Sequence, residues 1–466
     1  MQSRREQVRA YRFVTRRIVS ALLSGDPEST ELPMRRLGMA VFGSTMLAAI
    51  VFAAVGVYGL YNPGGGSLSD NTLVIERETG ARYVFVGGVL YPALNFTSAR
   101  LILGTPDPET RTMPQSDLRG LPRGRTVGIA GVPDAVPEPE ALVGLPWSIC
   151  SATSATTGTP TTQLTVGREV AGGGVLGGTS LLVQAGDAVY VIWHHHRLKV
   201  DNPGVLAALE IADATPIPVG DAILNAITAG PDLKAPAIPG AGDSSGREID
   251  GRDARIGDVY QRGSQYYVMV ADGLATISEV TAQLLLAGGG EARDVSANQA
   301  GELLSQARLE PEGYMTSMPR LRRLAPRDAA ICATFRGSAD ADQNITVEFF
   351  ERAPAELSAG GTTPPTTDRG VRTADRVIID GGHGALVRAL PVGGAEAPGA
   401  TVYLVTDEGA KYALTMKDVD AKAALGYAAV EPLPVPASLL SLLPTGPALN
   451  PAAALSYSRA PTTATP

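Results

Sequence analysis

The sequence predicts an α+β protein that is mostly β, with a single transmembrane helix ahead of a body built from hairpin–helix units. Three observations predict this. The chain of 466 residues holds one long apolar run, which indicates one membrane span and excludes a polytopic transporter. Its 53 glycines and 35 prolines exceed the usual share and favour many short strands and loops. Charged residues make up only 18% of the chain, which excludes a coiled coil with charged heptads.

The apolar run covers residues 37–61 and contains no charged side chain. That length crosses about 30 Å of hydrocarbon with some tilt. A buried core helix and a cleaved signal peptide are the alternatives, but the run is long for a signal peptide and begins far from the N-terminus. Arg35 and Arg36 flank its start, and basic residues are missing just after it. The positive-inside rule therefore predicts that residues 1–36 are cytoplasmic and that residues 62–466 lie outside the membrane.

The segment ahead of the span is basic, whereas the rest of the chain is acidic. Residues 1–36 carry a net charge of +4 and the remainder carries −12, for a total of −8. Apolar side chains recur with helical spacing at Val8, Tyr11, Val14, Ile18 and Leu22. With arginines on another face, this pattern predicts a basic amphipathic helix, which either lies on the anionic inner leaflet or docks on a membrane partner. The acidic body argues against nucleic acid as a partner.

Four segments of the body share one pattern. Each is an apolar strand, a turn and a second short strand, followed by a helix signal. They are residues 83–94, 190–200, 267–277 and 403–414. Suitable N-cap residues for the four helices are Asn95, Asp201, Ser278 and Asp418. We therefore expect four hairpin–helix repeat units, each of which needs neighbours to bury its apolar face.

The four units form two similar halves. The second and fourth units end in similar proline-rich tails, at 216–219 and 432–435, so units one and two look duplicated as units three and four. Cys150 and Cys332 occupy equivalent places after the first strands of the two halves. Equivalent positions can meet near a pseudo-twofold axis, and an oxidising outer location permits a disulfide between them. Two free buried thiols are the alternative.

Short motifs along almost the whole chain carry a family resemblance. They are YRF at 11–13 with Arg16 and Arg17, LYPALN at 90–95, TSARL at 97–101, WSIC at 147–150, GPDL at 230–233, APAIPG at 235–240 and LPTGP at 443–447. Together they resemble the EccB family, a core membrane component of the ESX or type VII secretion system. The resemblance implies an elongated periplasmic part in which small repeat domains surround a central β-rich core. One departure is the second hairpin tip, His194–His196, where other hairpins carry Gly or Asp-Gly.

The resemblance also implies a function and partners. It implies a structural subunit of the secretion complex, single-pass in the inner cell membrane, anchored by its cytoplasmic N-terminus and forming the periplasmic assembly. The implied partners are the membrane subunits EccC, EccD and EccE, the mycosin protease and further copies of the chain. Two alternatives stay open: an ATPase component of the same system, since ATPase activity is attributed to the family, and a cell-wall-binding module.

These inferences divide the chain into ten parts. They are a cytoplasmic basic helix (1–36), the transmembrane helix (37–61), unit one (70–134), the first half of the core (135–185), unit two (186–240), a linker (241–255), unit three (256–320), the second half of the core (321–398), unit four (399–450) and a disordered tail (451–466). We expect that removal of the tail leaves the body folded.

Motifs that carry chemistry in other proteins have weak support here. Residues 172–177 match G-x-G-x-x-G, but Gly178 stands where a phosphate loop requires Lys, and the next run reads as a strand. This favours a flexible hairpin or bulge. His194 and His196 share one face of a predicted strand, but zinc needs three or four ligands, and His383 is far away in the sequence.

Residues 242–246, GDSSG, resemble a serine-protease stretch, but no histidine lies in a context that supports a general base. We therefore expect no catalytic residue, no cofactor and no metal site. The residues singled out are the disulfide pair, Cys150 and Cys332, and the membrane flank, Arg35 and Arg36.

Overall fold

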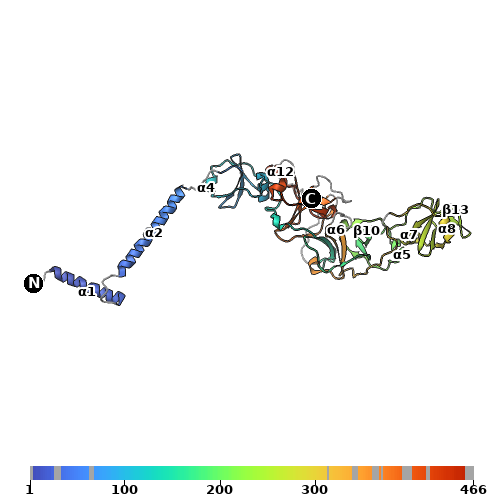
Figure 1. The fold of residues 1–466 in the computed structure, drawn as a ribbon, viewed down its shortest axis with the longest axis horizontal. Coiled ribbons are helices and arrows are strands. Elements are labelled where there is room, and N and C mark those ends of the chain that lie inside the picture. The colour runs from blue at the N-terminus through green and yellow to red at the C-terminus, as the bar shows by residue number, and fades with distance from the viewer. Residues whose placement is uncertain are drawn as a thin grey trace. The chain divides into compact units, whose positions relative to one another are not determined.

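The computed structural model separates the chain into two units, residues 1–69 and residues 70–466. It describes residues 4–25, 33–61, 68–311, 314–337, 345–358, 367–368, 371–390, 401–415 and 420–456. The first unit is helical and the second, called the body below, is rich in β-strands (Figure 1). This agrees with the mostly β, α+β class expected from the abundance of turn residues.

The N-terminal unit contains two helices. Helix α1 covers Arg4–Ser24 and helix α2 covers Pro33–Tyr61. Within α2, the 22 residues Leu37–Tyr58 are long and apolar enough to cross a membrane, and they are exposed over their whole length. Exposure of an all-apolar helix is stable only in a hydrocarbon environment, so the structure agrees with the predicted span.

A six-stranded central sheet lies in the middle of the body. Its strands, in spatial order, are β23 (Arg376–Ile378), β6 (Pro160–Val166), β5 (Trp147–Thr153), β19 (Ala330–Phe335), β20 (Ile345–Phe350) and β7 (Gly174–Val175). Its two middle strands, β5 and β19, are antiparallel and come from distant parts of the chain. The central sheet is therefore assembled by non-local pairing.

Four smaller sheets share one strand order. Three consecutive strands form an antiparallel meander, and a later short strand pairs in parallel with the first of them. The first sheet is β1 (Thr72–Glu76), β2 (Arg82–Val86), β3 (Val89–Pro92) and β4 (Thr110–Met113). The second is β8 (Ser180–Ala185), β9 (Ala188–Trp193), β10 (His196–Lys199) and β11 (Ile217–Pro218), with β12 (Thr228–Ala229) beside β10.

The third and fourth sheets repeat this order. The third is β15 (Val259–Arg262), β16 (Gln265–Val270), β17 (Gly273–Ile277) and β18 (Arg293–Asp294). The fourth is β24 (Gly384–Leu390), β25 (Val402–Thr406), β26 (Lys411–Leu414) and β27 (Leu433–Pro436). The proline-rich tails noted in the sequence are thus the parallel edge strands β11 and β27, where proline is tolerated.

A short helix follows the meander in each small sheet, and a second one follows the edge strand. The first set is α3 (Phe96–Leu103), α5 (Pro203–Ala208), α7 (Glu279–Leu286) and α10 (Ala421–Ala424). The second set is α4 (Gln115–Leu118), α6 (Asp221–Ala226), α8 (Ala297–Glu302) and α11 (Ala437–Leu440). The remaining described elements are η1 (Pro139–Ala141), β13 (Ser244–Ile249), β14 (Arg252–Arg255), α9 (Ala355–Ser358), β21 (Thr367–Asp368), β22 (Val371–Arg372) and α12 (Pro451–Leu455).

Two of the predicted helix caps are confirmed. The side chains of Asn95 and Ser278 accept hydrogen bonds from backbone N–H groups three residues on. The prediction of Asp201 is wrong by one residue, because Asn202 caps α5, with a proline at the first helical position. Asp418 lies outside the described residues, and Asp420 caps α10.

The segment 241–255, expected to be a linker, contains a β-hairpin. Strands β13 and β14 pair in antiparallel register, with Ile249 opposite Arg252. The residues between them, Asp250 and Gly251, both have positive φ, the geometry of a tight hairpin turn that Asp-Gly favours. Ile249 and Ala254 are buried against the third sheet. The prediction of a linker over 241–255 is therefore wrong for these residues, because the Asp250-Gly251 turn closes a paired hairpin.

Two predicted boundaries also differ from the observed sheets. Strand β8, placed at the end of the core segment 135–185, is the first strand of the second small sheet. Strand β24, placed in the core segment 321–398, is the first strand of the fourth. Both strands are as apolar as strands of the central sheet. Their pairing partners show that they belong to the small sheets.

The apolar cores connect the sheets in a non-sequential order. The largest core lies on the central sheet and includes residues of the second and fourth small sheets, such as Leu181 and Val405. A second core joins the fourth sheet to Leu101 of helix α3, which follows the first sheet, and to Ile129. A third joins the second sheet to Val280 and Leu284 of α7. Sheet one therefore packs with sheet four, and sheet two packs with the helix of sheet three.

The expectation of a disordered tail over 451–466 is wrong for its first residues. Helix α12 begins at Pro451, and Asn450 caps it by accepting a hydrogen bond from the backbone of Ala452. Ala454 is fully buried, and its carbonyl accepts a hydrogen bond of 2.8 Å from Gly128 N. Residues 457–466 lie outside the described residues. Small apolar residues in the sequence Pro-Ala-Ala-Ala-Leu favour a helix once the cap is present.

We predict that truncation after Asn450 destabilises the body, contrary to the expectation from sequence. Loss of α12 removes the buried Ala454 and the Gly128 hydrogen bond, which together contribute about 1–3 kcal/mol. The midpoint of thermal unfolding, followed by circular dichroism, should fall by several degrees. Truncation after Ser456 is the matched control and should leave the midpoint unchanged. Equal midpoints for the two truncations would contradict the packing described for α12.

Candidate anchoring and interaction sites

Large exposed apolar side chains are concentrated in the N-terminal unit. The predicted stripe of α1, from Val8 to Leu22, is at least half exposed at every apolar position. In the described part of the body, only four large apolar residues have comparable exposure: Leu94, Val175, Leu304 and Leu455. The body is thus built to be surrounded by water, whereas α1 and α2 require lipid or protein around them.

The predicted membrane flank lies at the start of α2. Arg35 and Arg36 belong to this helix by their backbone, but their side chains lie outside the described residues. The uncharged span begins at the next residue, Leu37. The predicted membrane orientation therefore rests on the sequence. The structure shows that the flank and the span form one continuous helix.

A disulfide joins the two middle strands of the central sheet. Cys150 on β5 and Cys332 on β19 are directly opposite each other in the antiparallel register, with their Cα atoms 4.0 Å apart. Both are 1% exposed, and they pack against Val170, Phe350 and Leu357. The bond closes a loop across a sequence separation of 182 residues. It therefore ties the first half of the body to the second at their shared strand pair.

A row of hydrogen-bonded polar side chains crosses the same face of the sheet, two residue pairs along from the disulfide. Ser148 Oγ lies 3.0 Å from Thr334 Oγ1, whose hydroxyl donates to Glu348 at 2.9 Å. Arg336 donates to Glu348 at 2.7 Å and to Glu169 at 2.6 Å. The mostly buried carboxylate of Glu348 is thus paired and hydrogen-bonded, as a desolvated charge must be. These hydrogen bonds fix the strand register that places the two cysteines opposite each other.

Strand β7 supports the far edge of the central sheet, and it explains the Gly-rich motif. Gly174 and Val175 pair with β20, and β8 follows, so the motif does not open a helix. A Cβ atom added at Gly173 or Gly174 would lie 2.8 Å or 2.7 Å from the Phe350 or Phe349 ring. Glycine here permits close packing of the edge strand over two aromatic rings, which requires no phosphate.

The histidines and the GDSSG stretch lie apart from one another. His194 is in the turn between β9 and β10, with a positive φ, and His196 begins β10. His383 lies in another loop and contacts the Gly381 carbonyl. Ser245 donates to the Ala254 carbonyl within the β13–β14 hairpin. Among the described residues, no three His, Cys, Asp or Glu side chains are grouped as metal ligands would be.

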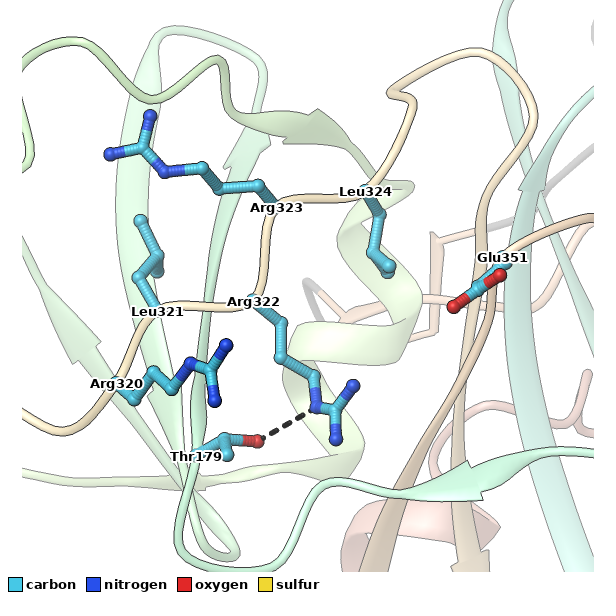
Figure 2. A pocket seen from close by; sticks show the side chains of 7 residues that line it. All are labelled: Thr179, Arg320, Leu321, Arg322, Arg323, Leu324 and Glu351. Atoms are coloured by element: carbon cyan, nitrogen blue, oxygen red, sulfur yellow. Dashed lines mark hydrogen bonds between the residues drawn. The ribbon is translucent and has the colours of Figure 1, made fainter.

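A cavity of about 480 Å³ lies where the segment 320–324 crosses the edge of the second small sheet (Figure 2). Its lining residues are Thr179, Arg320, Leu321, Arg322, Arg323, Leu324 and Glu351. We call it the arginine pocket. Backbone hydrogen bonds with Ser180, of 3.0 Å and 2.8 Å, hold the segment against the start of β8. The sequence signal of this pocket is the arginine-rich stretch Pro-Arg-Leu-Arg-Arg-Leu-Ala-Pro-Arg at 319–327, which spans the predicted domain boundary at residue 320.

Among the residues that the structure describes, an acidic partner is present for one of the three arginines in this pocket. Arg323 makes two hydrogen bonds to Asp213, of 2.6 Å and 2.8 Å. These bonds lower the pKa of Asp213 below its usual value and raise the pKa of Arg323. Arg322 instead stacks over the Phe349 ring at 4.2 Å and donates from Nε to Thr179 Oγ1 at 3.1 Å.

Comparisons with known proteins agree with one another. Residues 1–460 match the family described as "Type VII secretion system ESX-1, transport TM domain B". The "ESX-3 secretion system ATPase EccB3" of Mycolicibacterium smegmatis is 28% identical, over 96% of this chain and 89% of that protein. The "ESX-5 secretion system ATPase EccB5" of Mycobacterium tuberculosis is 28% identical, over 97% of this chain and 93% of that protein.

Solved structures give the same result. A chain of an intact ESX-5 inner membrane complex matches with a TM-score of 0.62 and 28% identity, covering 100% of this chain and 98% of that one. A chain of the EccB3 dimer from the ESX-3 core complex matches with a TM-score of 0.62 and 27% identity, covering 83% of this chain and 100% of that one.

We predict that loss of the disulfide destabilises the body strongly. In the double variant Cys150→Ala/Cys332→Ala, the unfolded chain regains the freedom of a long closed loop, which corresponds to about 5 kcal/mol. Denaturant unfolding of the detergent-solubilised chain should show this loss, and the unchanged chain should approach the variant when a reductant is added. An alkylating reagent should modify neither cysteine without reductant and both with it. Equal mass under the two conditions would contradict the bond.

Proposed function

This chain belongs to the EccB family of type VII secretion proteins, and we propose that it is a structural subunit of an ESX inner-membrane complex. The observation that carries the proposal is the match to a chain of an intact ESX-5 inner membrane complex over 100% of this sequence. A chain that corresponds to its relative from end to end, including the anchor, has the parts needed for the same place in an assembly.

We place the chain in the inner membrane as a single-pass protein, with α1 in the cytoplasm and the body in the periplasm. The basic flank and the charge-free span of α2 support this orientation. The disulfide supports it independently, because such bonds persist in oxidising compartments. A related structure is described as the periplasmic assembly of an ESX-5 complex, and its chain matches 84% of this one.

The proposed partners are the membrane subunits EccC, EccD and EccE, the mycosin protease and a second copy of the chain. The descriptions of the solved relatives, an inner membrane complex and an EccB3 dimer, support a multisubunit assembly that includes a homo-oligomer. The exposed apolar stripe of α1 supports a contact near the membrane, with either lipid or another subunit.

We further propose that the body is a duplicated set of four repeat units around the central sheet. The common strand order of the four small sheets supports this proposal. The packing supports it too. Units one and four share a core, and so do units two and three. If unit one is exchanged with unit three and unit two with unit four, the first contact becomes the second, as expected for a twofold duplication. The paired cysteines would then lie on the pseudo-twofold axis.

The word "ATPase" in the names of the relatives describes those proteins, and we propose that this chain acts without hydrolysing ATP. Its Gly-rich loop lacks the lysine of a phosphate loop and leads into a strand rather than a helix. Two glycines of this loop, Gly173 and Gly174, lie so close to the Phe350 and Phe349 rings that a Cβ atom would collide with them. Packing thus accounts for these two glycines without a phosphate.

Affinity purification of the C-terminally tagged full chain from detergent-solubilised membranes tests the proposed function. We expect a megadalton-scale complex on a native gel, with EccC-like and EccD-like proteins identified by mass spectrometry. A chain that migrates alone would contradict the structural role, and ATP turnover and binding to purified peptidoglycan would then separate the two alternatives.

Substitutions in α1 refine this experiment. Val14→Asp places a carboxylate in the apolar stripe, whereas Ala10→Asp places the same group outside it and serves as the control. If the stripe docks on a subunit, only Val14→Asp should reduce the yield of the complex. If the stripe lies on lipid, Val14→Asp should weaken membrane attachment of an isolated α1 peptide and leave the purified complex intact.

A further inference from the structure

The arginine pocket contains two guanidinium groups without a carboxylate partner. Within the described residues, neither Arg320 nor Arg322 takes part in an ion pair, whereas the neighbouring Arg323 is held by Asp213. Figure 2 shows the Arg320 and Arg322 side chains on either side of Thr179, with Glu351 on the far wall. Two positive charges that line one cavity favour the binding of an anion there.

Arg322 is held in place before any ligand arrives. Its backbone N–H donates to the Ser180 carbonyl at 2.8 Å, its Nε donates to Thr179, and its guanidinium lies over the Phe349 ring. These contacts leave its two terminal nitrogens to donate to a ligand. A guanidinium fixed in this way loses little conformational entropy on binding, and its fork geometry suits a carboxylate.

The other walls distinguish a peptide from a small inorganic anion. The volume of about 480 Å³ is that of a site for a ligand of many atoms. Leu324 supplies apolar surface beside Arg322, whereas the Leu321 side chain lies on the opposite side of the segment and packs against the core of the second sheet (Figure 2). A second cavity of about 170 Å³ shares residues 321–324 with the arginine pocket. Glu351 weakens the binding of any anion, but it can accept a hydrogen bond from a peptide N–H, a donor that inorganic phosphate does not offer.

We propose that the arginine pocket binds an acidic peptide segment of a protein partner, in which carboxylates alternate with apolar side chains. Arg320 and Arg322 pair with the carboxylates, and Leu324 contacts an apolar side chain. This inference goes beyond the proposed function, because it rests on the pocket alone and holds whichever assembly contains the chain.

Binding of a probe peptide to the full chain in detergent tests the proposal. The probe is a fluorescein-labelled hexapeptide, Asp-Leu-Glu-Leu-Asp-Leu, read by fluorescence anisotropy. A peptide with Asn and Gln in place of the acids is the control ligand. We expect Arg320→Gln/Arg322→Gln to weaken binding of the acidic peptide about tenfold or more, since charge-assisted hydrogen bonds are lost. Arg327→Gln, in the same segment but outside the lining, should change it less than about twofold.

Two further variants separate the pocket from general effects. Glu351→Gln should strengthen binding of the acidic peptide a few-fold, because one repulsive carboxylate is removed. Arg320→Gln alone avoids the stacked Arg322, so it gives a result even if the double variant unfolds.

Equal affinity of Arg320→Gln and the unchanged chain would overturn the proposal, and so would equal binding of the amide control peptide. Displacement of the probe by inorganic phosphate at concentrations similar to those of unlabelled peptide would assign the pocket to phosphate instead. The native-gel experiment is independent of these outcomes, so failure of the pocket and failure of the proposed function are distinguishable.

Discussion

The antiparallel pairing of β5 with β19 is the contact on which the body depends. It joins strands from the two halves of the chain, and the disulfide fixes it across a separation of 182 residues. Each small sheet has an apolar face, and exposure of that face to water is unfavourable, so each sheet needs a neighbour to cover it. The central sheet supplies that neighbour for the second and fourth sheets, which in turn cover residues of the first and third. One strand pair thus positions every other unit of the body.

This arrangement suits a protein that holds other proteins in place. The anchor is apolar and continuous, whereas the body shows little apolar surface in its described residues and is closed by a covalent bond. A framework gains from such rigidity, since forces or contacts at one end are transmitted through packed sheets rather than absorbed by a flexible linker. The segment 241–255 illustrates this, because it forms a paired hairpin against the third sheet.

Local signals in the sequence predicted local structure well. The apolar span, the meander hairpins and the caps Asn95 and Ser278 depend on neighbouring residues, and the structure has them where they were expected. The edge strands β11 and β18 are only two residues long and pair in parallel with distant partners, so no periodicity reveals them. The arginine pocket was missed for the same reason: its contacts connect residues 110 and 143 positions apart.

Native-state hydrogen exchange, read by mass spectrometry of peptic peptides, tests the central claim most directly. If the β5–β19 pair holds the body together, backbone amides of these two strands should exchange most slowly in the body. Reduction of the disulfide should then accelerate exchange in them and in the four small sheets together. The account would be contradicted if the small sheets kept their protection after the two central strands had exchanged, because each unit would then be stable without the pair.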